Sequence, residues 1–224
     1  MSMYNYIVDH IPRNTPNDRR PGIAMTANTL TIHTTGNPDS SARNERGWLT
    51  NPSNKRTASY HIVVDEHEVI EVIPLTENAW HAGDGNGDGN RKSIGIEICE
   101  SGNYGKTIQN AAELVAHMLY ERGWGVDRLR RHFDWSGKIC PRLMYSGGKW
   151  TAWERFKLMV QKELEGMEKQ KQQDYVGHWA EASIRRVMDV GIMNGRNTGF
   201  APNEPITRAE IAVVADRILK QMGK

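Results

Sequence analysis

A histidine and a cysteine lie close together in RHFDWSGKICPR, residues 131–142. Seven residues separate His132 from Cys140, and imidazole and thiolate are both good zinc ligands, so this loop could bring the two onto one ion. His33 could supply a third ligand, which would leave a fourth position for water, as in a catalytic zinc site. A structural site would need a further protein ligand, and Cys99 is the only other cysteine. Spacing alone indicates such a site only weakly.

Two alternating segments each place a titratable side chain opposite their apolar residues. In SIGIEICE (93–100) the three isoleucines share one face, and in NTLTIHTT (28–35) a leucine and an isoleucine do the same. Because successive side chains of a strand point to opposite faces, Glu97 and His33 point away from these apolar faces. A carboxylate in mid-strand is costly unless it meets solvent or a polar site. The pattern therefore predicts either a shared polar site or exposed positions on a one-sided sheet.

The elements that would position these residues follow from periodicity. Four segments show the alternation and β-branched content of strands: 28–35, 58–65, 68–75 and 93–100. One helix is predicted over 107–123, with Thr107 as its cap and Gly123 at its end. A second is predicted from large side chains three or four apart, closing at Gly166: Trp150, Trp153, Phe156, Val160 and Leu164. Residues 1–27 are rich in Pro, Asn and Arg, which predicts an extended N-terminal segment that leads into the domain.

Composition divides the chain of 224 residues into two domains. Residues 166–173 are polar and lack an apolar stripe, which is typical of a linker. Before them, 1–165 carry the strand and helix patterns of an α/β domain. After them, 174–224 contain two helix patterns around a segment rich in Gly, Pro and Asn, which predicts a small all-α domain.

Charge and hydropathy exclude several classes of partner. The formal net charge of +2 gives no argument for nucleic acid, and no apolar run is long enough to span a membrane. The N-terminal residues lack the basic and apolar segments of a secretory signal, so we expect the protein to stay in the cytoplasm until something else releases it. In that compartment both cysteines are expected to be reduced, as core residues or metal ligands.

The loop GDGNGDGN (83–90) resembles half of a calcium-binding loop. Counted from Asp84, the twelfth position should be a bidentate Glu and is Gly95 instead, and no Walker phosphate motif follows. Because this loop precedes the strand that carries Glu97, we expect it to form the rim of a substrate groove.

Five motifs in this order resemble the zinc-dependent N-acetylmuramoyl-L-alanine amidases: TIHTT, ASYHIVVD, NAWHAG, SIGIEIC and RHFDWSGKICP. This amidase type 2 family includes bacteriophage endolysins and peptidoglycan recognition proteins, and the resemblance covers roughly residues 20–165. It implies an α/β fold, a mixed β-sheet flanked by helices, with Zn²⁺ in a surface groove. The implied reaction is hydrolysis of the bond between N-acetylmuramic acid and the L-alanine of the stem peptide. A phage or prophage endolysin is the reading favoured over a host autolysin or a non-catalytic recognition protein.

The resemblance also implies roles for individual residues. The zinc ligands fall on His33, His132 and Cys140, and recognition proteins that do not cut typically lack the cysteine. The catalytic positions fall on Glu97, Lys138 and Tyr60. Trp80 and His81 are expected to contact substrate, whereas His61 is expected to pack or hydrogen-bond within the protein.

Residues 174–224 resemble a single S-layer homology (SLH) module, through HWA, GIMNG and ITRAE. Such modules bind secondary cell-wall polymers, normally as a set of three, so this copy could instead serve for oligomerisation. Arg208 and then Trp179 are the expected polymer contacts, because a guanidinium suits an anionic polymer. Structural roles could also explain parts of this motif. Thr207 and Glu210 form a helix capping box, and Trp179 could belong to a core.

Overall fold

The sheet that carries both site strands lies in the first of two units into which the chain divides, Met1–Glu163 and Leu164–Lys224. The computed structural model describes residues 4–196 and 199–223, and for 170–173 the backbone alone. The strand order across the sheet is β1-β4-β3-β5-β2-β6. The strands are β1 (Asn5–Val8), β2 (Thr29–Thr34), β3 (Ile62–Val64), β4 (Glu68–Glu71), β5 (Ser93–Ile98) and β6 (Leu129–Arg131).

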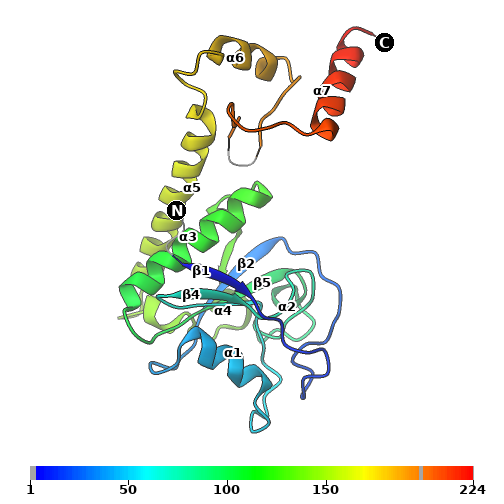
Figure 1. Cartoon of the computed structure of the whole chain (residues 1–224). Helices are drawn as coiled ribbons and strands as arrows, with labels where there is room; N and C mark the ends of the chain where they lie inside the picture. Colours follow the sequence, from blue (N-terminus) through cyan, green and yellow to red (C-terminus); the bar gives the residue numbers. More distant parts are fainter. Residues whose placement is uncertain (1–3, 197–198, 224) are drawn as a thin grey trace. The chain divides into compact units, whose positions relative to one another are not determined.

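The sheet is mixed. β3 and β4 pair antiparallel, as a hairpin through 65–67, and every other neighbouring pair is parallel. Helices cover both faces, with α3 (Tyr104–Arg122) on one side and α1 (Ala42–Thr50) on the other (Figure 1). The predicted class, a mixed sheet flanked by helices, is confirmed.

The two strands that carry His33 and Glu97 lie inside the sheet. β2 lies between β5 and β6, and all six of its residues are buried. A parallel strand covered by helices on both faces must bury both of its sides, so polar residues there need partners within the protein. The alternative of exposed positions on a one-sided sheet is therefore wrong for His33.

Three elements were not predicted from the sequence, because they lack an apolar pattern. β1 lies in the segment expected to be an extended lead-in, and it is an edge strand with no fully buried residue. β6 has three residues, two of them arginines. α1 buries only Ala42 and Leu49 and is fixed at its start by Ser41, whose side chain accepts from the Asn44 N–H.

The predicted helix ends were partly wrong. α3 begins at Tyr104 with Asn103 as its cap, four residues before the cap expected at Thr107. It does end at Gly123, which has a φ of 64°. The second helix, α5 (Thr151–Gln173), runs past Gly166, because the Glu, Lys and Gln that follow are good helix formers. Residues 166–173, expected as a linker on composition, are thus helical, and the unit boundary lies within α5.

The second unit contains α6 (Glu181–Asp189) and α7 (Arg208–Gln221). Ile184 and Tyr175 are buried in it, and the Tyr175 ring meets Phe200 edge-on at 6.0 Å between centroids. The expected capping box is present, with Thr207 and Glu210 exchanging side-chain to backbone hydrogen bonds. Among the described helices of both units, none is long and apolar enough to cross a membrane.

The remaining helices are short. They are α2 (Asp88–Arg91), α4 (His132–Ser136) and the 3₁₀ turns Val126–Arg128 and Arg142–Met144.

Candidate metal centre

Strand register brings His33 and Glu97 together. β2 and β5 pair parallel with these two residues as direct partners, which places their side chains on the same face. The His33 Nδ1 lies 4.0 Å from the Glu97 Oε1. The shared polar face predicted from alternation is therefore present.

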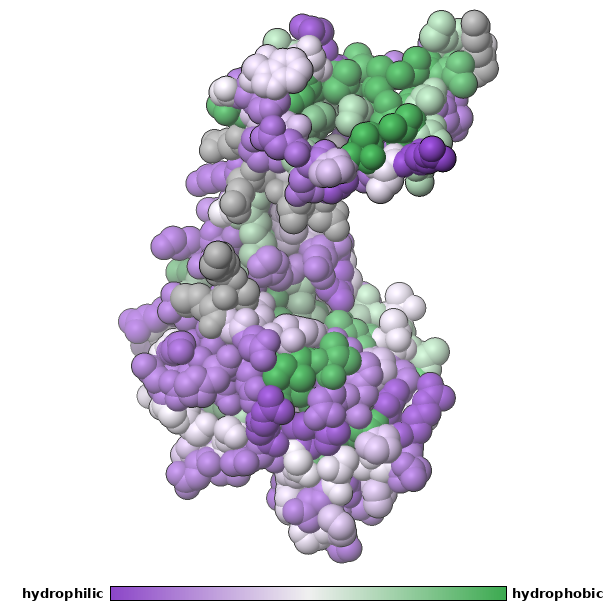
Figure 2. Space-filling view, viewed as in Figure 1, coloured by the Kyte–Doolittle hydropathy of each residue, from purple (hydrophilic) through white to green (hydrophobic). Residues whose placement is uncertain are grey.

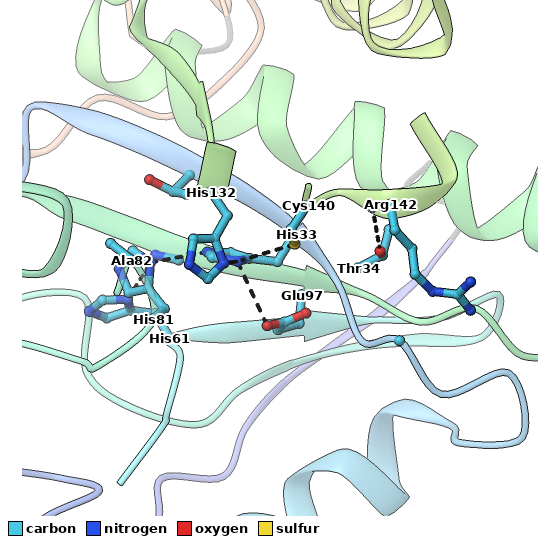
Figure 3. A network of polar contacts seen from close by, with 12 residues as sticks. His33, Thr34, His61, His81, Ala82, Glu97, His132, Cys140 and Arg142 are labelled. Carbon is cyan, nitrogen blue, oxygen red and sulfur yellow. Dashed lines mark hydrogen bonds and ion pairs between the residues drawn. The ribbon is translucent and has the colours of Figure 1, made fainter. Parts of the chain in front are cut away.

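His132 and Cys140 reach the same place from the segment that follows β6. His132 is the first residue of α4, which ends at Gly137 with a φ of 74°. The chain then turns back, so that the Phe133 N–H donates to the Cys140 carbonyl at 3.2 Å. The loop thereby folds its two candidate ligands onto one spot beside His33 (Figure 3).

The three side chains have the spacing of ligands around one tetrahedral ion. The His33 Nδ1 lies 3.1 Å from the His132 Nδ1 and 3.7 Å from the Cys140 Sγ. In a tetrahedral zinc site with ordinary bond lengths, two nitrogens lie about 3.3 Å apart and a nitrogen and a sulfur about 3.6 Å apart. All three ligand atoms lie within 4.8 Å of one another, and this is the one such His/Cys/Asp/Glu group among the described residues.

The protonation chemistry also fits a cation. Burial lowers the pKa of His33 well below its usual value and that of His132 to about 4, so both imidazoles are neutral and can donate a lone pair. Burial raises the pKa of the Cys140 thiol to about 12, so a thiolate needs a neighbouring positive charge. A divalent ion bound here would supply that charge.

A cavity of about 770 Å³ opens beside these residues. It extends from the candidate ligands along α1 and the loop before β3. It is lined by His33, Glu97, His132, Lys138 and Cys140, by Tyr60 and Trp80, and by Asn44, Glu45, Trp48, Asn54 and Arg56, among others.

The three expected catalytic side chains all line this cavity. The Glu97 side chain is 17% exposed, and burial, with Glu45 as a second cause, raises the pKa of its carboxyl to about 8. Its Oε2 and the Tyr60 hydroxyl are buried without a hydrogen-bond partner in the described part of the chain. Burial also raises the pKa of Tyr60 well above its usual value, whereas Lys138 is exposed.

Trp80 and His81, the expected substrate contacts, both line the cavity but differ in their surroundings. Trp80 is half-buried, and its indole N–H donates to the Asp18 carbonyl at 2.9 Å. His81 is buried, with one ring nitrogen 3.1 Å from His33 and the other 3.1 Å from the Ser93 carbonyl. His61 packs within the protein as expected: it bonds to the Glu77 carbonyl and to the Gly95 N–H.

Sequence reasoning missed Glu45, a second carboxylate in the cavity. Burial raises its pKa, and Ser40 and Asn37 hydrogen-bond its side chain. It lies in the first turn of α1, so recognising that helix from its Ser41 cap was the only route to it.

The glycine-rich loop 83–90 does not form the rim of the groove, because none of its residues lines the cavity. The carboxylate of Asp84 instead accepts from the Gly89 N–H at 2.7 Å and the Asn90 N–H at 3.2 Å. These bonds are those of a carboxylate at the start of a short helix, α2.

In the second unit, Arg208 and Trp179 are both exposed. Trp179 is 92% exposed, so the reading of this residue as core is wrong. A separate cavity of about 460 Å³ lies in this unit between α7 and the segment before it, lined by Arg196, Glu204, Val213 and Arg217, among others. Neither Arg208 nor Trp179 lines it.

Comparisons with known proteins agree with this division. A family model described as N-acetylmuramoyl-L-alanine amidase matches residues 23–143, and one described as the S-layer homology domain matches residues 174–212. The amidase XlyB of Bacillus subtilis is 49% identical over 148 residues, which cover 64% of this chain and 45% of XlyB. The amidase CwlA of the same organism is 50% identical over 131 residues, covering 56% of this chain and 47% of CwlA. The chain thus spans less than half of either relative.

Two solved structures resemble the first unit. The catalytic domain of XlyA is 41% identical with a TM-score of 0.63, covering 70% of this chain and 99% of that one. A mutant endolysin from Bacillus subtilis is 40% identical with a TM-score of 0.64, covering 70% of this chain and 99% of its own.

Proposed function

Because this chain belongs to the N-acetylmuramoyl-L-alanine amidase family, we propose that its first unit is a zinc-dependent peptidoglycan hydrolase. The bond cut is the amide between N-acetylmuramic acid and the L-alanine of the stem peptide. One observation carries the proposal: two neutral histidines and a cysteine converge beside a buried carboxyl at the head of a cavity. A non-catalytic recognition protein would need neither that carboxyl nor the cysteine ligand.

His33, His132 and Cys140 would hold the ion and leave a position open towards the cavity. Zinc at this place supplies a Lewis acid that activates water and polarises the amide carbonyl.

Glu97 carries the proton in this proposal. An amide is a poor electrophile with a poor leaving group, so one side chain must take a proton from the attacking water and deliver it to the departing nitrogen. A carboxyl whose pKa is raised to about 8 can hold and release a proton near neutral pH. Its Oε1, 4.0 Å from the His33 Nδ1, is the carboxyl oxygen beside the candidate ligands and is placed for this transfer.

Lys138 and Tyr60 stabilise the negative charge that develops on the carbonyl oxygen. Lys138 lines the cavity two residues before Cys140 and brings a positive charge. Tyr60 brings a hydroxyl with no partner in the described part of the chain, and burial keeps it protonated as a donor.

The second unit binds the cell wall in this proposal, and the protein acts there as an endolysin of a phage or prophage. Its match to the S-layer homology domain supports attachment to a secondary cell-wall polymer, with exposed Arg208 and Trp179 as contacts. An exposed guanidinium is suited to an anionic polymer.

A second role for this unit is self-association. None of the described residues of α7 is buried, although Ile211, Val213 and Leu219 are apolar. Figure 2 shows apolar side chains gathered at the surface of this unit. Light scattering of the purified chain tests this role: a mass above one chain supports it, and a monomer at high concentration contradicts it.

The amidase itself is tested by incubating the metal-replete protein with Gram-positive cell walls. New alanine amino termini without new reducing ends support the proposal. New reducing ends would instead indicate a glycosidase, and zinc binding without any cleavage would indicate a recognition protein.

A further inference from the structure

The outer nitrogen of His33 is fixed by a chain of hydrogen bonds that starts at a backbone carbonyl. The Ser93 carbonyl can only accept, so the His81 Nε2 at 3.1 Å must carry a hydrogen. The neutral imidazole of His81 then has a bare Nδ1. This Nδ1 accepts from the His33 Nε2–H at 3.1 Å, which leaves the His33 Nδ1 bare and facing His132 and Cys140.

The other histidine of the centre, His132, has its outer hydrogen bond to Ala82, the residue after His81. The imidazole of His132 hydrogen-bonds the Ala82 carbonyl (Figure 3). Both histidines therefore take their outer hydrogen bonds from the dipeptide 81–82. Histidine ligands depend on such outer partners for their tautomer and orientation.

A single side-chain atom holds that dipeptide. The Asn90 Oδ1 accepts from the His81 N–H and from the Ala82 N–H, each at 2.8 Å. Asn90 is buried, so neither N–H has water as an alternative partner in that place.

The glycine-rich loop in turn fixes Asn90. Its amide nitrogen donates to the Gly85 carbonyl at 2.9 Å, and its backbone N–H donates to the Asp84 carboxylate at 3.2 Å. The second oxygen of that carboxylate accepts from the Gly89 N–H at 2.7 Å.

The His81 ring packs closely against Gly95 of β5. A Cβ on Gly95 would lie 2.6 Å from the Cγ of His81, so the imidazole fills the space that a side chain at Gly95 would take. Gly95 lies in the middle of β5 and does not have a positive φ, so this packing is the reason for a glycine there.

We propose that the loop 83–90 is the outer scaffold of the metal centre, and that Asn90 and Asp84 are positioning residues that orient His33 and His132 through the dipeptide 81–82. This inference rests on the proposed function for the identity of the ion. It assigns the glycine-rich loop neither calcium binding nor substrate contact. It also assigns His81 to the support of His33.

The test compares two asparagines of the same loop. Asn90→Ala removes the shared acceptor, whereas Asn86→Ala changes an exposed residue with no role in the scaffold. Zinc affinity is measured by competition with a chromogenic chelator, and the tautomers of His33 and His81 are read by ¹⁵N NMR in the metal-free protein. Thermal unfolding of both variants is recorded alongside.

Zinc binding should weaken by about 10- to 100-fold in Asn90→Ala, the range found for outer partners of metal ligands, and stay unchanged in Asn86→Ala. In the wild type both His33 and His81 should carry their hydrogen on Nε2, and in Asn90→Ala the His33 signals should show mixed tautomers. If Asn90→Ala does not fold, Asp84→Asn provides the same comparison with a smaller expected loss.

Wild-type zinc affinity in Asn90→Ala or Asp84→Asn, or a hydrogen on the Nδ1 of His33 in the wild type, would overturn the inference. A wild-type protein that binds no zinc would contradict the proposed function instead, and the tautomers would still test the scaffold.

Discussion

The two units support their functional side chains in opposite ways. In the first unit, the metal centre lies on interior strands, and His33 lies within about 4 Å of four other candidate site residues. In the second, Trp179 is 92% exposed and α7 buries none of its described residues. A reaction that moves protons needs groups fixed before the substrate arrives. A surface that binds a polymer can complete its geometry with its partner.

Replacing Glu97, the proposed proton carrier of the first unit, should have the largest effect on catalysis. Glu97→Gln keeps the shape and the burial of the side chain but removes the titrating group. We expect kcat to fall by about 10²- to 10⁴-fold, the usual contribution of a general acid–base, with zinc content unchanged. Cleavage is followed by release of alanine amino termini, and near-normal turnover would remove Glu97 from the mechanism.

Oxyanion stabilisation should be the next largest effect. Lys138→Met removes the lysine charge beside the candidate ligands and should lower kcat by about 10²- to 10³-fold, as for loss of one oxyanion donor. Lys149→Met is the matched control, because it alters an exposed lysine that does not line the cavity. Equal rates for the two variants would count against Lys138. Tyr60→Phe, measured in the same assay, divides the role between the two groups.

An ion pair in the first unit should contribute more to the free energy of unfolding than an exposed ion pair in the second. In the first unit, Glu77 is 10% exposed, and Arg20, with Arg13, lowers the pKa of its carboxyl from the usual 4.5. A lowered pKa means that the pair stabilises the fold fully above about pH 4.5, and that this stabilisation is lost as the pH falls through the lowered value.

Glu77→Gln should therefore lower the free energy of unfolding by about 1–3 kcal/mol at pH 7 and flatten its acid dependence. Glu181→Gln, in an exposed pair with Arg185 of the second unit, should leave the profile unchanged. Urea unfolding at pH 3 to 7 measures both, and identical profiles would contradict the distinction.

The smallest expected effect on catalysis comes from the exposed unit. Arg208→Ala and Trp179→Ala should weaken sedimentation with intact walls and leave hydrolysis of a soluble muramoyl peptide unchanged. Unaltered wall binding in both variants would shift attention to the cavity lined by Arg196 and Arg217.

The same contrast explains what could be read from the sequence. Alternation in two strands placed His33 and Glu97 on one face, and register made them neighbours. The mixed sheet was implied by the family resemblance that the five ordered motifs carry. Glu45 was missed because α1 buries only two residues and so lacks an apolar period.

The role of loop 83–90 could not be predicted for a different reason. Its composition suits calcium, turns and mobile segments alike, and only the packed structure shows that its Asn90 holds residues 81–82. Of the two interpretations of Trp179, polymer contact and core, the core one is wrong, because a small unit with few buried residues leaves this side chain exposed.

The most direct test of the central claim is a zinc titration of chelator-treated protein, with release of alanine amino termini from purified cell walls as the readout. The predicted result is no cleavage without metal and a rate that rises linearly to saturation at one zinc per chain. Full cleavage without metal, or one bound zinc per chain without cleavage, would contradict the account.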